Sequence, residues 1–351
     1  MDSGYKREPD RRYYKVMFHN KYREMITEGY LEHVIKRGRE MKARNIHRKL
    51  YTNSGQSESL WSHILFEHPA TFDTLAMEPW KKQEIIEDLE TFAKSKDYYS
   101  RIGKAWKRRY LLYGPPGTGK STMIAAMANL LEYDLYDIEL TSVRDNTELR
   151  RLLTDTTNKS IIVIEDIDCS LDLTGQRRAK PEPGKENKED GSSKVTLSGL
   201  LNFIDGLWSS CGGERLIVFT TNRVDKLDPA LTRRGRMDKH IELVYCNFEG
   251  FKVLARNYLN LEDEKHPLFP TVEQLMTETV ITPADVAENL MPKSPNEDAN
   301  KCLKRLIQAM EEANTKQQRE KIDILKEELE QDKAENSPAV LVLEEHQPHE
   351  D

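Results

Sequence analysis

One short stretch of this sequence has the residue types and the spacing that bind phosphate groups. It reads Gly114-Pro115-Pro116-Gly117-Thr118-Gly119-Lys120-Ser121 and lies between an apolar run and a run rich in Ala, Met and Leu. Glycines allow backbone N–H groups to turn toward an anion, and the amino end of a following helix adds partial positive charge. Lys120 can then reach the β- and γ-phosphates, and the Ser121 hydroxyl can bind Mg²⁺. We therefore predict an ATP site with Mg²⁺ rather than a structural glycine-rich turn.

A second chemical feature is a group of acids that follows the apolar run Ile161–Ile164. Glu165 and Asp166 come directly after this run, and Asp168 follows them. A buried strand that ends in carboxylates beside a phosphate-binding loop supplies what Mg²⁺ coordination and water activation require. The alternative is a strand cap in a polar turn, but that would not account for three carboxylates in four positions. We expect these acids at the nucleotide site.

The elements that must position these groups alternate between short apolar runs and helical runs. The apolar runs are rich in β-branched residues, and alternation of this kind indicates a parallel sheet covered by helices on both faces. The expected fold is therefore α/β, with three αβα layers. We expect strands at residues 110–113, 135–140, 161–164 and 216–220, and helices at 79–94, 121–131, 147–154, 195–208 and 301–331. A basic amphipathic helix is expected at 22–44, with Met25, Tyr30, Val34 and Ile35 on its apolar face.

Composition limits the classes of partner and compartment. The 351 residues carry a net charge of −7, which hides a net +7 over residues 1–50 and a net −8 over residues 311–351. The basic end can favour an anionic lipid or an acidic partner, or it can be a solvated helical face. The acidic balance and the lack of a basic, aromatic segment disfavour nucleic acid. Four widely spaced cysteines and no apolar run of membrane-spanning length lead us to expect a soluble chain with reduced thiols.

Taken together, these motifs resemble the AAA ATPases, a family of ring-forming mechanical ATPases. Within that family the sequence is most similar to the branch of the mitochondrial Rieske-protein translocase of complex III assembly, especially its plant members. The resemblance runs from about Phe72 to Leu290. Its motifs are Walker A at 114–121, Walker B at 161–168 with the usual Asp-Glu order reversed, sensor 1 at 220–223, the second region of homology at 227–238, sensor 2 at 282–285, and a lead-in at 68–75 that runs beside the adenine in relatives.

The resemblance implies roles for the acids and for one amide. Glu165 takes the Mg²⁺ side together with Ser121, and Asp166 takes the position that activates water. Asn222 would orient that water or sense the γ-phosphate. Because Asp is one methylene shorter than Glu, its reach must be restored by backbone placement or by Asp168.

The resemblance also implies groups that act between subunits. Arg233 and Arg236 are expected to reach the ATP of a neighbouring subunit as arginine fingers, which neutralise charge in the transition state. Ala284 would meet the nucleotide from the sensor 2 helix. The active form is then a homo-oligomeric ring of six or seven subunits.

The expected organisation has four parts. They are a partial α+β N-terminal associated domain at 1–67, an ATPase core at 68–246 with a disordered insertion at about 173–194, a helical lid at 247–310, and a charged helix with an acidic tail at 311–351. Members of this branch usually begin with a membrane-spanning helix, which this sequence lacks. Membrane association and an organelle, mitochondrion or endoplasmic reticulum, therefore rest on the resemblance alone.

Two functions remain open at this point. The first is an active ring ATPase that remodels or translocates an unidentified protein partner, and the second is an ATP-binding scaffold or switch with little turnover. Threading unfoldases carry an aromatic residue and a glycine in a pore loop, whereas the corresponding residues 140–145, LTSVRD, contain neither. Gripping of an unfolded chain by this loop is therefore not expected.

Overall fold

The computed structural model describes residues 15–44, 48–53, 59–170, 195–205, 213–233, 235–261 and 266–335. The chain divides into two compact units between His47 and Arg48, and each is described by itself. The insertion expected at about 173–194 and the acidic tail after residue 335 lie outside the described residues.

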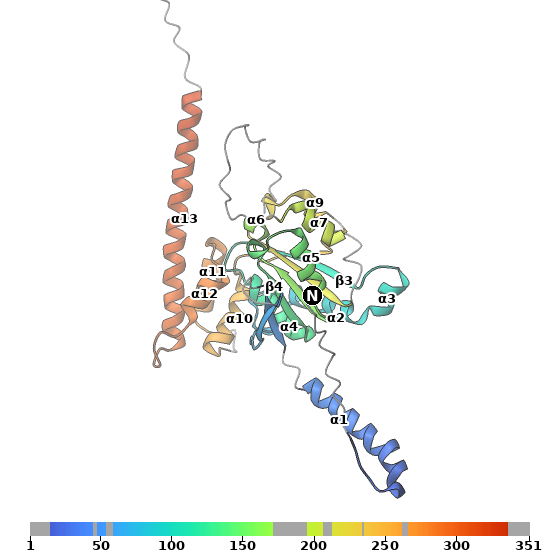
Figure 1. Cartoon of the computed structure of the whole chain (residues 1–351). Helices are drawn as coiled ribbons and strands as arrows, with labels where there is room; N and C mark the ends of the chain where they lie inside the picture. The colour runs from blue at the N-terminus through green and yellow to red at the C-terminus, as the bar shows by residue number, and fades with distance from the viewer. Residues whose placement is uncertain are drawn as a thin grey trace, which may run out of the picture. The chain divides into compact units, whose positions relative to one another are not determined.

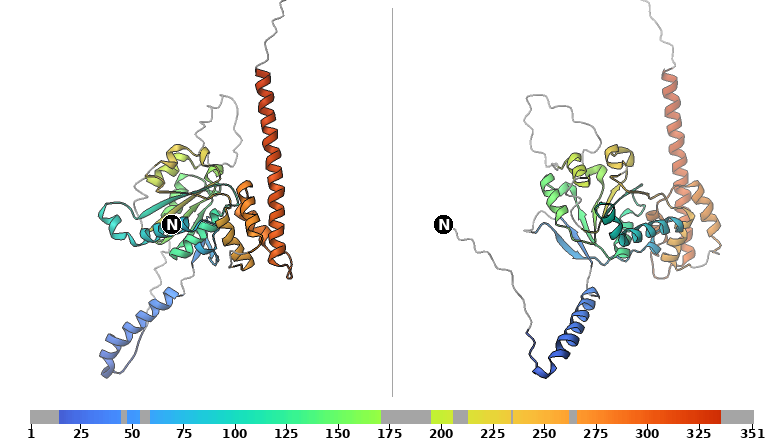
Figure 2. Two further views of the ribbon diagram at one scale, coloured as in Figure 1. Left: turned by 180° about the vertical axis from the view of Figure 1, so that it is seen from behind. Right: turned by 90° about the vertical axis from the view of Figure 1, so that its right-hand side faces the viewer.

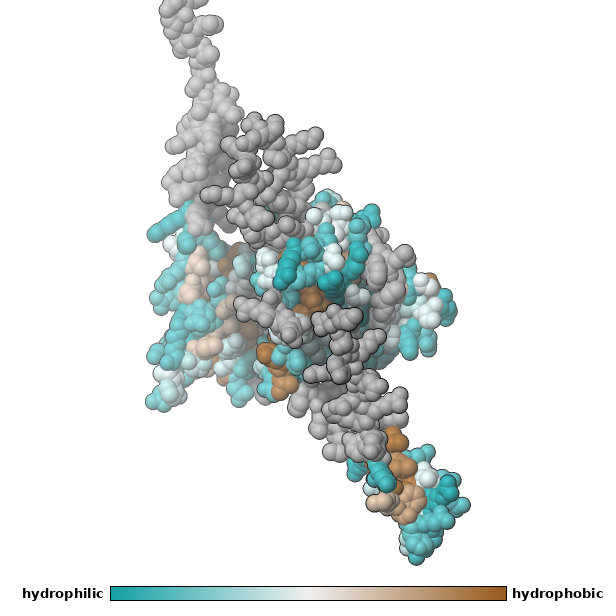
Figure 3. Space-filling view, viewed as in Figure 1, coloured by the Kyte–Doolittle hydropathy of each residue, from teal (hydrophilic) through white to brown (hydrophobic). Residues whose placement is uncertain are grey.

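The first unit is helical from Asn20 onward in its described part. It contains a 3₁₀ turn at Asn20–Tyr22, a π-helical segment at Met25–Tyr30 and helix α1 at Leu31–Arg44, so the predicted helix at 22–44 is confirmed apart from its irregular start. Its predicted apolar face is exposed rather than packed, and Figure 3 shows hydrophobic surface beside hydrophilic surface on this unit. The exposed residues of that face are Met25, Tyr30, Val34 and Ile35.

The second unit is built on one seven-stranded sheet with the order β2-β1-β4-β5-β6-β3-β7. Every neighbouring pair is parallel except β1 with β2, which is antiparallel. The carboxyl ends of the parallel strands therefore meet at one edge of the sheet, where loops can form a site. The strands are β1 Lys49–Thr52, β2 Ser62–Leu65, β3 Lys107–Tyr113, β4 Asp134–Ile138, β5 Ser160–Ile164, β6 Arg215–Thr221 and β7 Lys239–Glu242.

Helices cover both faces of this sheet, which confirms the expected three-layer αβα fold (Figures 1 and 2). Alternate residues of β5 divide between the two cores: Ile162 and Ile164 pack with helices α5 and α7, whereas Ile161 and Val163 pack with α2 and α4. A strand buried on both faces needs apolar residues at every position, which is why the run was recognisable in the sequence. The helices of the core are α2 Pro79–Lys94, α3 Lys96–Arg101, α4 Lys120–Leu131, α5 Asn146–Thr154, α6 Ile167–Ser170, α7 Leu197–Asp205 and α9 Pro229–Thr232, with 3₁₀ turns at Phe72–Thr74, Leu140–Ser142 and Val224–Lys226.

The sheet begins earlier in the chain than the predicted core at 68–246. Strands β1 and β2 precede residue 68, yet β1 pairs with β4 and so extends the ATPase sheet. These strands and β7 were not individually predicted, because each is four residues long and none is a continuous buried apolar run. Asn53 fastens the end of β1 to the core, since its amide donates to the Glu139 carbonyl at 3.1 Å and accepts from the Glu139 N–H at 2.9 Å.

Four helices form the C-terminal lid, and they bury a third apolar cluster between them. The last of them, α13, runs without a break past residue 310, where the lid was expected to end. Its buried residues up to Met310 pack with the other lid helices, and the Gln317 side chain donates to the Val280 carbonyl at 2.9 Å. None of the described helices has the length and apolar character needed to cross a membrane. The lid helices are α10 Phe248–Leu259, α11 Phe269–Glu278, α12 Pro283–Leu290 and α13 Ala299–Glu335.

The contact between Asn53 and Glu139 gives a test of the early start of the sheet. Asn53 is buried, so Asn53→Ala leaves the N–H and the carbonyl of Glu139 without their side-chain partner and should lower the free energy of unfolding by about 1–3 kcal/mol. Denaturant unfolding measures this change. Ser62→Ala is the control, because the Ser62 hydroxyl makes one long, exposed bond of 3.4 Å and its loss should cost under about 0.5 kcal/mol. Equal effects of the two substitutions would contradict the prediction.

Candidate nucleotide-binding site

The phosphate-binding loop leaves the carboxyl end of β3 and enters the amino end of α4. Gly114, Gly117 and Gly119 have φ angles of +144°, +77° and +96°, which residues with a side chain rarely adopt. At Gly114 a Cβ atom would also lie 1.9 Å from the carbonyl oxygen of Leu243. The glycines are therefore required by the path of the loop, as the sequence predicted.

Lys120 lies at the start of α4 with its ammonium group inside the loop. Its Nζ donates to the carbonyls of Gly114 and Pro115 at 2.8 and 3.0 Å and to Asn222 Oδ1 at 2.7 Å. Burial lowers the pKa of Lys120, and the three carboxylates that follow β5 oppose this shift. The lysine thus lies between the loop that binds phosphate and the end of β6 that carries Asn222.

Ser121 and Glu165 come together as the sequence predicted for a Mg²⁺ site. The Ser121 hydroxyl donates to Glu165 Oε1 at 3.1 Å, so two oxygen ligands of the kind that Mg²⁺ prefers are adjacent. Asp137 on β4 also lies near Glu165, and burial, followed by the charges of Glu165 and Glu139, raises its pKa to about 6. Sequence reasoning missed Asp137, since an acid inside a predicted strand does not show which distant residues it will face.

Asp166 is placed by an unusual backbone conformation. Its φ angle is +46°, in the left-handed region that residues with a side chain seldom occupy, and its N–H donates to Thr220 Oγ1 at 3.0 Å. Asn222 Nδ2 donates to Asp166 Oδ1 at 3.3 Å while Asn222 Oδ1 accepts from Lys120. Asn222 therefore links the lysine of the loop to the acid expected to activate water.

Asp168 has a different environment from Asp166. Its carboxylate accepts from the Thr221 hydroxyl at 2.8 Å and from the Asn222 N–H at 3.4 Å, so it holds the end of β6. Of the two ways to restore the reach of the shorter Asp166 side chain, these contacts favour backbone placement. Thr220 and Thr221 lay within the predicted sensor 1 stretch, but the sequence did not assign them these contacts.

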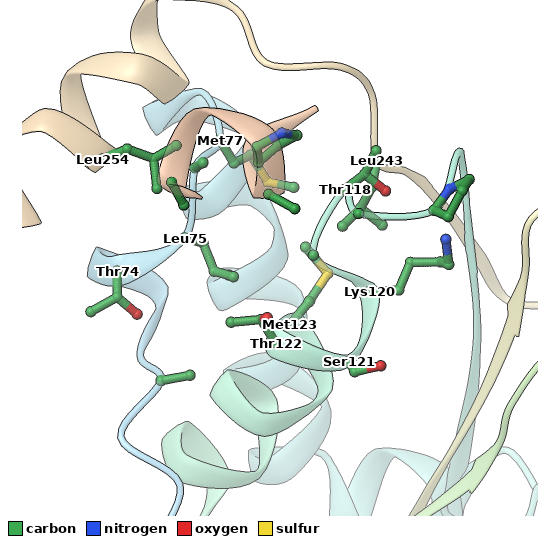
Figure 4. Close-up of a pocket in the computed structure, with 18 of the residues that line it drawn as sticks. Thr74, Leu75, Met77, Thr118, Lys120, Ser121, Thr122, Met123, Leu243 and Leu254 are labelled. Carbon is green, nitrogen blue, oxygen red and sulfur yellow. The ribbon is translucent and has the colours of Figure 1, made fainter. Parts of the chain in front are cut away.

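A cavity of about 690 Å³ joins these groups to the lid and to the lead-in segment. Figure 4 shows Lys120 and Ser121 on one side of this cavity and Thr74 and Leu254 on the other. The whole phosphate-binding loop from Pro116 onward, the acids Glu165 and Asp166, and Asn222 line it. The remaining lining residues are His68, Pro69, Ala70, Thr74, Leu75, Ala76, Met77, Thr122, Met123, Thr220, Leu243, Leu254, Asn257, Tyr258, Pro283, Ala284 and Ala287.

Hydrogen bonds from two lid helices join the lid to the wall of the cavity. At α12, the Ala284 N–H donates to the Gly117 carbonyl at 3.1 Å, so the predicted sensor 2 residue touches the phosphate-binding loop itself. At α10, Asn257 Nδ2 donates to the Thr74 carbonyl at 3.2 Å. Sequence reasoning missed Asn257 and its neighbour Tyr258, because nothing in a helical run indicates which residues will face a distant loop.

Arg233 and Arg236 do not line the cavity of their own chain, unlike Lys120, Ser121, Glu165, Asp166, Asn222 and Ala284. Arg233 is exposed, and Arg236 is partly buried with its Nη1 donating to the Ala230 carbonyl at 2.7 Å. Both lie between α9 and β7, in a segment that returns from the carboxyl edge of the sheet to its amino edge. The structure therefore places these arginines apart from the polar groups that surround the cavity, which are Lys120, Ser121, Glu165, Asp166 and Asn222.

Comparison with known proteins gives two matching family models. The model of the ATPase family associated with various cellular activities (AAA) matches residues 110–245, and the model of the At3g28540-like AAA+ ATPase lid domain matches residues 246–322. Together they cover the core from β3 onward and most of the lid.

Three similar curated proteins are from Arabidopsis thaliana. The chain is 60% identical over 333 residues to "AAA-ATPase ASD, mitochondrial", 61% identical over 331 residues to "AAA-ATPase At3g28580" and 57% identical over 329 residues to "AAA-ATPase At3g28540". Each match covers 88% of this chain and 65%, 66% and 64% of the relative, respectively. The chain thus spans just under two thirds of the length of these relatives.

The geometry around Lys120 predicts the effect of removing it. Lys120→Ala deletes the ammonium group that faces the cavity, and loss of a charge-assisted bond of about 3 kcal/mol should weaken binding of a fluorescent ATP analogue about 100-fold. Fluorescence anisotropy measures this affinity. Lys104→Ala, at an exposed position outside the cavity lining, is the matched control and should bind normally. Tight binding by Lys120→Ala would contradict the assignment of the phosphate site.

Proposed function

Since the chain belongs to the AAA ATPase family, we propose that it binds ATP with Mg²⁺ and hydrolyses the terminal phosphate. The observation that carries this proposal is the convergence of Lys120, Ser121, Glu165, Asp166 and Asn222 on one cavity, from the ends of three neighbouring strands. The cavity volume of about 690 Å³ is within the range of small-molecule sites.

The residues around Ser121 fit a nucleotide-bound Mg²⁺. Ser121 Oγ and Glu165 Oε1 are two oxygen donors 3.1 Å apart, and both line the cavity beside Lys120. They would hold the ion from the protein side, since Mg²⁺ commonly takes one or two protein ligands and completes its shell with phosphate and water. The ion, when bound, would neutralise charge on the phosphates.

Asp166, Asn222 and Lys120 would have different roles in hydrolysis. Asp166 would accept a proton from the attacking water, and its left-handed backbone directs the short side chain into the cavity. Asn222 would fix that carboxylate through its Nδ2 while its Oδ1 holds Lys120. Lys120 must exchange its present bonds to the Gly114 and Pro115 carbonyls for bonds to phosphate oxygens.

The positions of the arginines support action between subunits. Arg233 and Arg236 are absent from the cavity lining of their own chain, and β3 separates their segment from the phosphate-binding loop. We therefore propose a homo-oligomeric ring in which both residues approach the ATP of a neighbour. An arginine supplied in this way can raise the rate of phosphoryl transfer by about 10³–10⁵.

The ring is proposed to remodel or translocate a protein partner. The loop between β4 and α5 buries its two apolar residues, Leu140 and Val143, in the core and exposes Thr141, Ser142 and Arg144. An exposed polar loop cannot grip an unfolded chain by aromatic contacts, which supports a folded or otherwise differently held substrate. Membrane association remains a proposal that rests on resemblance to the branch named above.

Hydrolysis provides the direct test of this function. Asp166→Asn should lower the single-turnover rate by at least about 100-fold while analogue binding is kept, because the base is lost and the phosphate contacts remain. Arg233→Ala should cause a loss of similar size if the arginine acts on the transition state. Wild-type protein that binds ATP but turns over no faster than Asp166→Asn would instead support the scaffold or switch.

Assembly is tested separately by mass photometry. With a slowly hydrolysed ATP analogue and Mg²⁺, we expect particles of about six or seven subunits, because the two halves of each site then lie on different chains. The same protein without nucleotide is the control for spontaneous association. A monomer under every nucleotide condition would rule out the intersubunit role of the arginines.

A further inference from the structure

The segment that carries Arg233 and Arg236 is fastened to the amino half of β3 by Asp238. The Asp238 carboxylate accepts from the backbone N–H of Arg109 at 2.9 Å, and the Asp238 N–H donates to the Arg109 carbonyl at 3.0 Å. Asp238 therefore both accepts from and donates to the backbone of Arg109 in β3. It does so one residue before the β3–β7 ladder begins with the pair Tyr110 and Lys239.

The guanidinium of Arg109 strengthens the same connection. It donates to the Gly235 carbonyl at 3.0 Å and to the Ile204 carbonyl at 3.2 Å, and its Nη1 lies 3.7 Å from Asp238 Oδ2. The Arg109 side chain is only 16% exposed, so its charge is largely removed from water. A buried charge is costly without a counter-charge, and the Asp238 carboxylate provides one.

These bonds fix the turn from which the two arginines project. Gly235 has a φ angle of +93°, and its carbonyl is the acceptor for Arg109. Across this turn, the N–H of Arg236 donates to the Arg233 carbonyl at 3.1 Å. The Gly235 anchor therefore lies within two residues of both arginines, and the Asp238 anchor follows Arg236 by two residues.

The connection is remote from the phosphate site of its own chain. Arg109 precedes Gly114 by five positions on an extended strand, which corresponds to about 16 Å. Neither Arg109 nor Asp238 lines the nucleotide cavity. Loss of the connection should therefore disturb the arginine segment and leave nucleotide binding in place.

We propose that Asp238, together with Arg109, is a positioning pair that presents Arg233 and Arg236 to the neighbouring subunit. This inference rests on the proposed function, in which both arginines act on a neighbour's ATP. Without Asp238, the turn at Gly235 loses its backbone anchor and Arg109 loses its counter-charge. Arg233 and Arg236 would then occupy the position beside the neighbour's ATP for a smaller fraction of the time.

Variants of the pair should lower turnover without lowering affinity. We expect Asp238→Ala to reduce kcat at least about tenfold, a part of the 10³–10⁵ that an arginine finger supplies. Asp238→Asn should be milder, because its side-chain oxygen can still accept from the Arg109 N–H. Arg109→Met should also lower kcat, since it keeps that backbone bond but frees the Gly235 carbonyl. Affinity for the fluorescent ATP analogue should stay within about twofold.

Mixed rings distinguish a positioning role from a general structural one. Asp166→Asn subunits lack the activating carboxylate but keep intact arginines, whereas Asp238→Ala subunits have the reverse defect. We expect hydrolysis to recover when the two inactive proteins are mixed, because an intact site then meets an intact arginine segment. Arg233→Ala mixed with Asp166→Asn is the reference. Glu84→Gln, which breaks the adjacent Lys239–Glu84 ion pair of 2.8 Å outside this segment, is the control and should retain wild-type kcat.

The outcomes separate this inference from the proposed function. Rescue of Arg233→Ala without rescue of Asp238→Ala would overturn the positioning role and leave the ATPase ring intact. Wild-type kcat in Asp238→Ala, or loss of analogue binding in both Asp238→Asn and Arg109→Met, would also overturn it. If the wild type hydrolyses ATP but Arg233→Ala is not rescued, the intersubunit role fails and the positioning role fails with it. If the wild type does not hydrolyse ATP, the proposed function itself fails.

Discussion

Strand β3 is hydrogen-bonded along its whole length to β6 on one side, and from Tyr110 onward to β7 on the other. This pairing is the constraint on which the rest of the site depends. At its carboxyl end β3 releases Gly114 beside the end of β6, so that Lys120 and Asn222 come within hydrogen-bond distance. Toward its amino end the same strand holds the segment before β7 through Asp238.

The rigidity of this arrangement comes from burial on both faces of the sheet. Leu111 packs in one core, and Tyr110 and Leu112 pack in the other, all of them fully buried. Strand β5, two strands away, is also fully buried. Strands fixed in this way can support a strained backbone at their ends, such as the left-handed Asp166 that follows β5. The buried centres of the strands thus hold the sheet in place, and the residues at the strand ends can adopt the conformations that the site requires.

The lid is joined to the site more lightly than the strands are joined to each other. Its contacts with the phosphate loop and the lead-in include single bonds, from Ala284 to Gly117 and from Asn257 to Thr74, while most of its apolar cluster comes from its own helices. Such a division permits a lid to shift as a body when the contents of the cavity change.

The sequence by itself determined the phosphate-binding loop, the acids after β5, the αβα layers and the family. Local rules suffice for the first three, because glycine spacing and runs buried on both faces can be recognised without knowledge of the fold, whereas the family follows from the resemblance of the motifs. The tertiary structure alone decided that β1 and β2 join the core sheet, that the Asp168 carboxylate accepts from the Asn222 N–H, and that Asn257 donates to Thr74. It also showed that Arg233 and Arg236 lie outside their own cavity. Each of these depends on contacts between residues distant in the chain, and neither composition nor periodicity encodes which distant residues will meet.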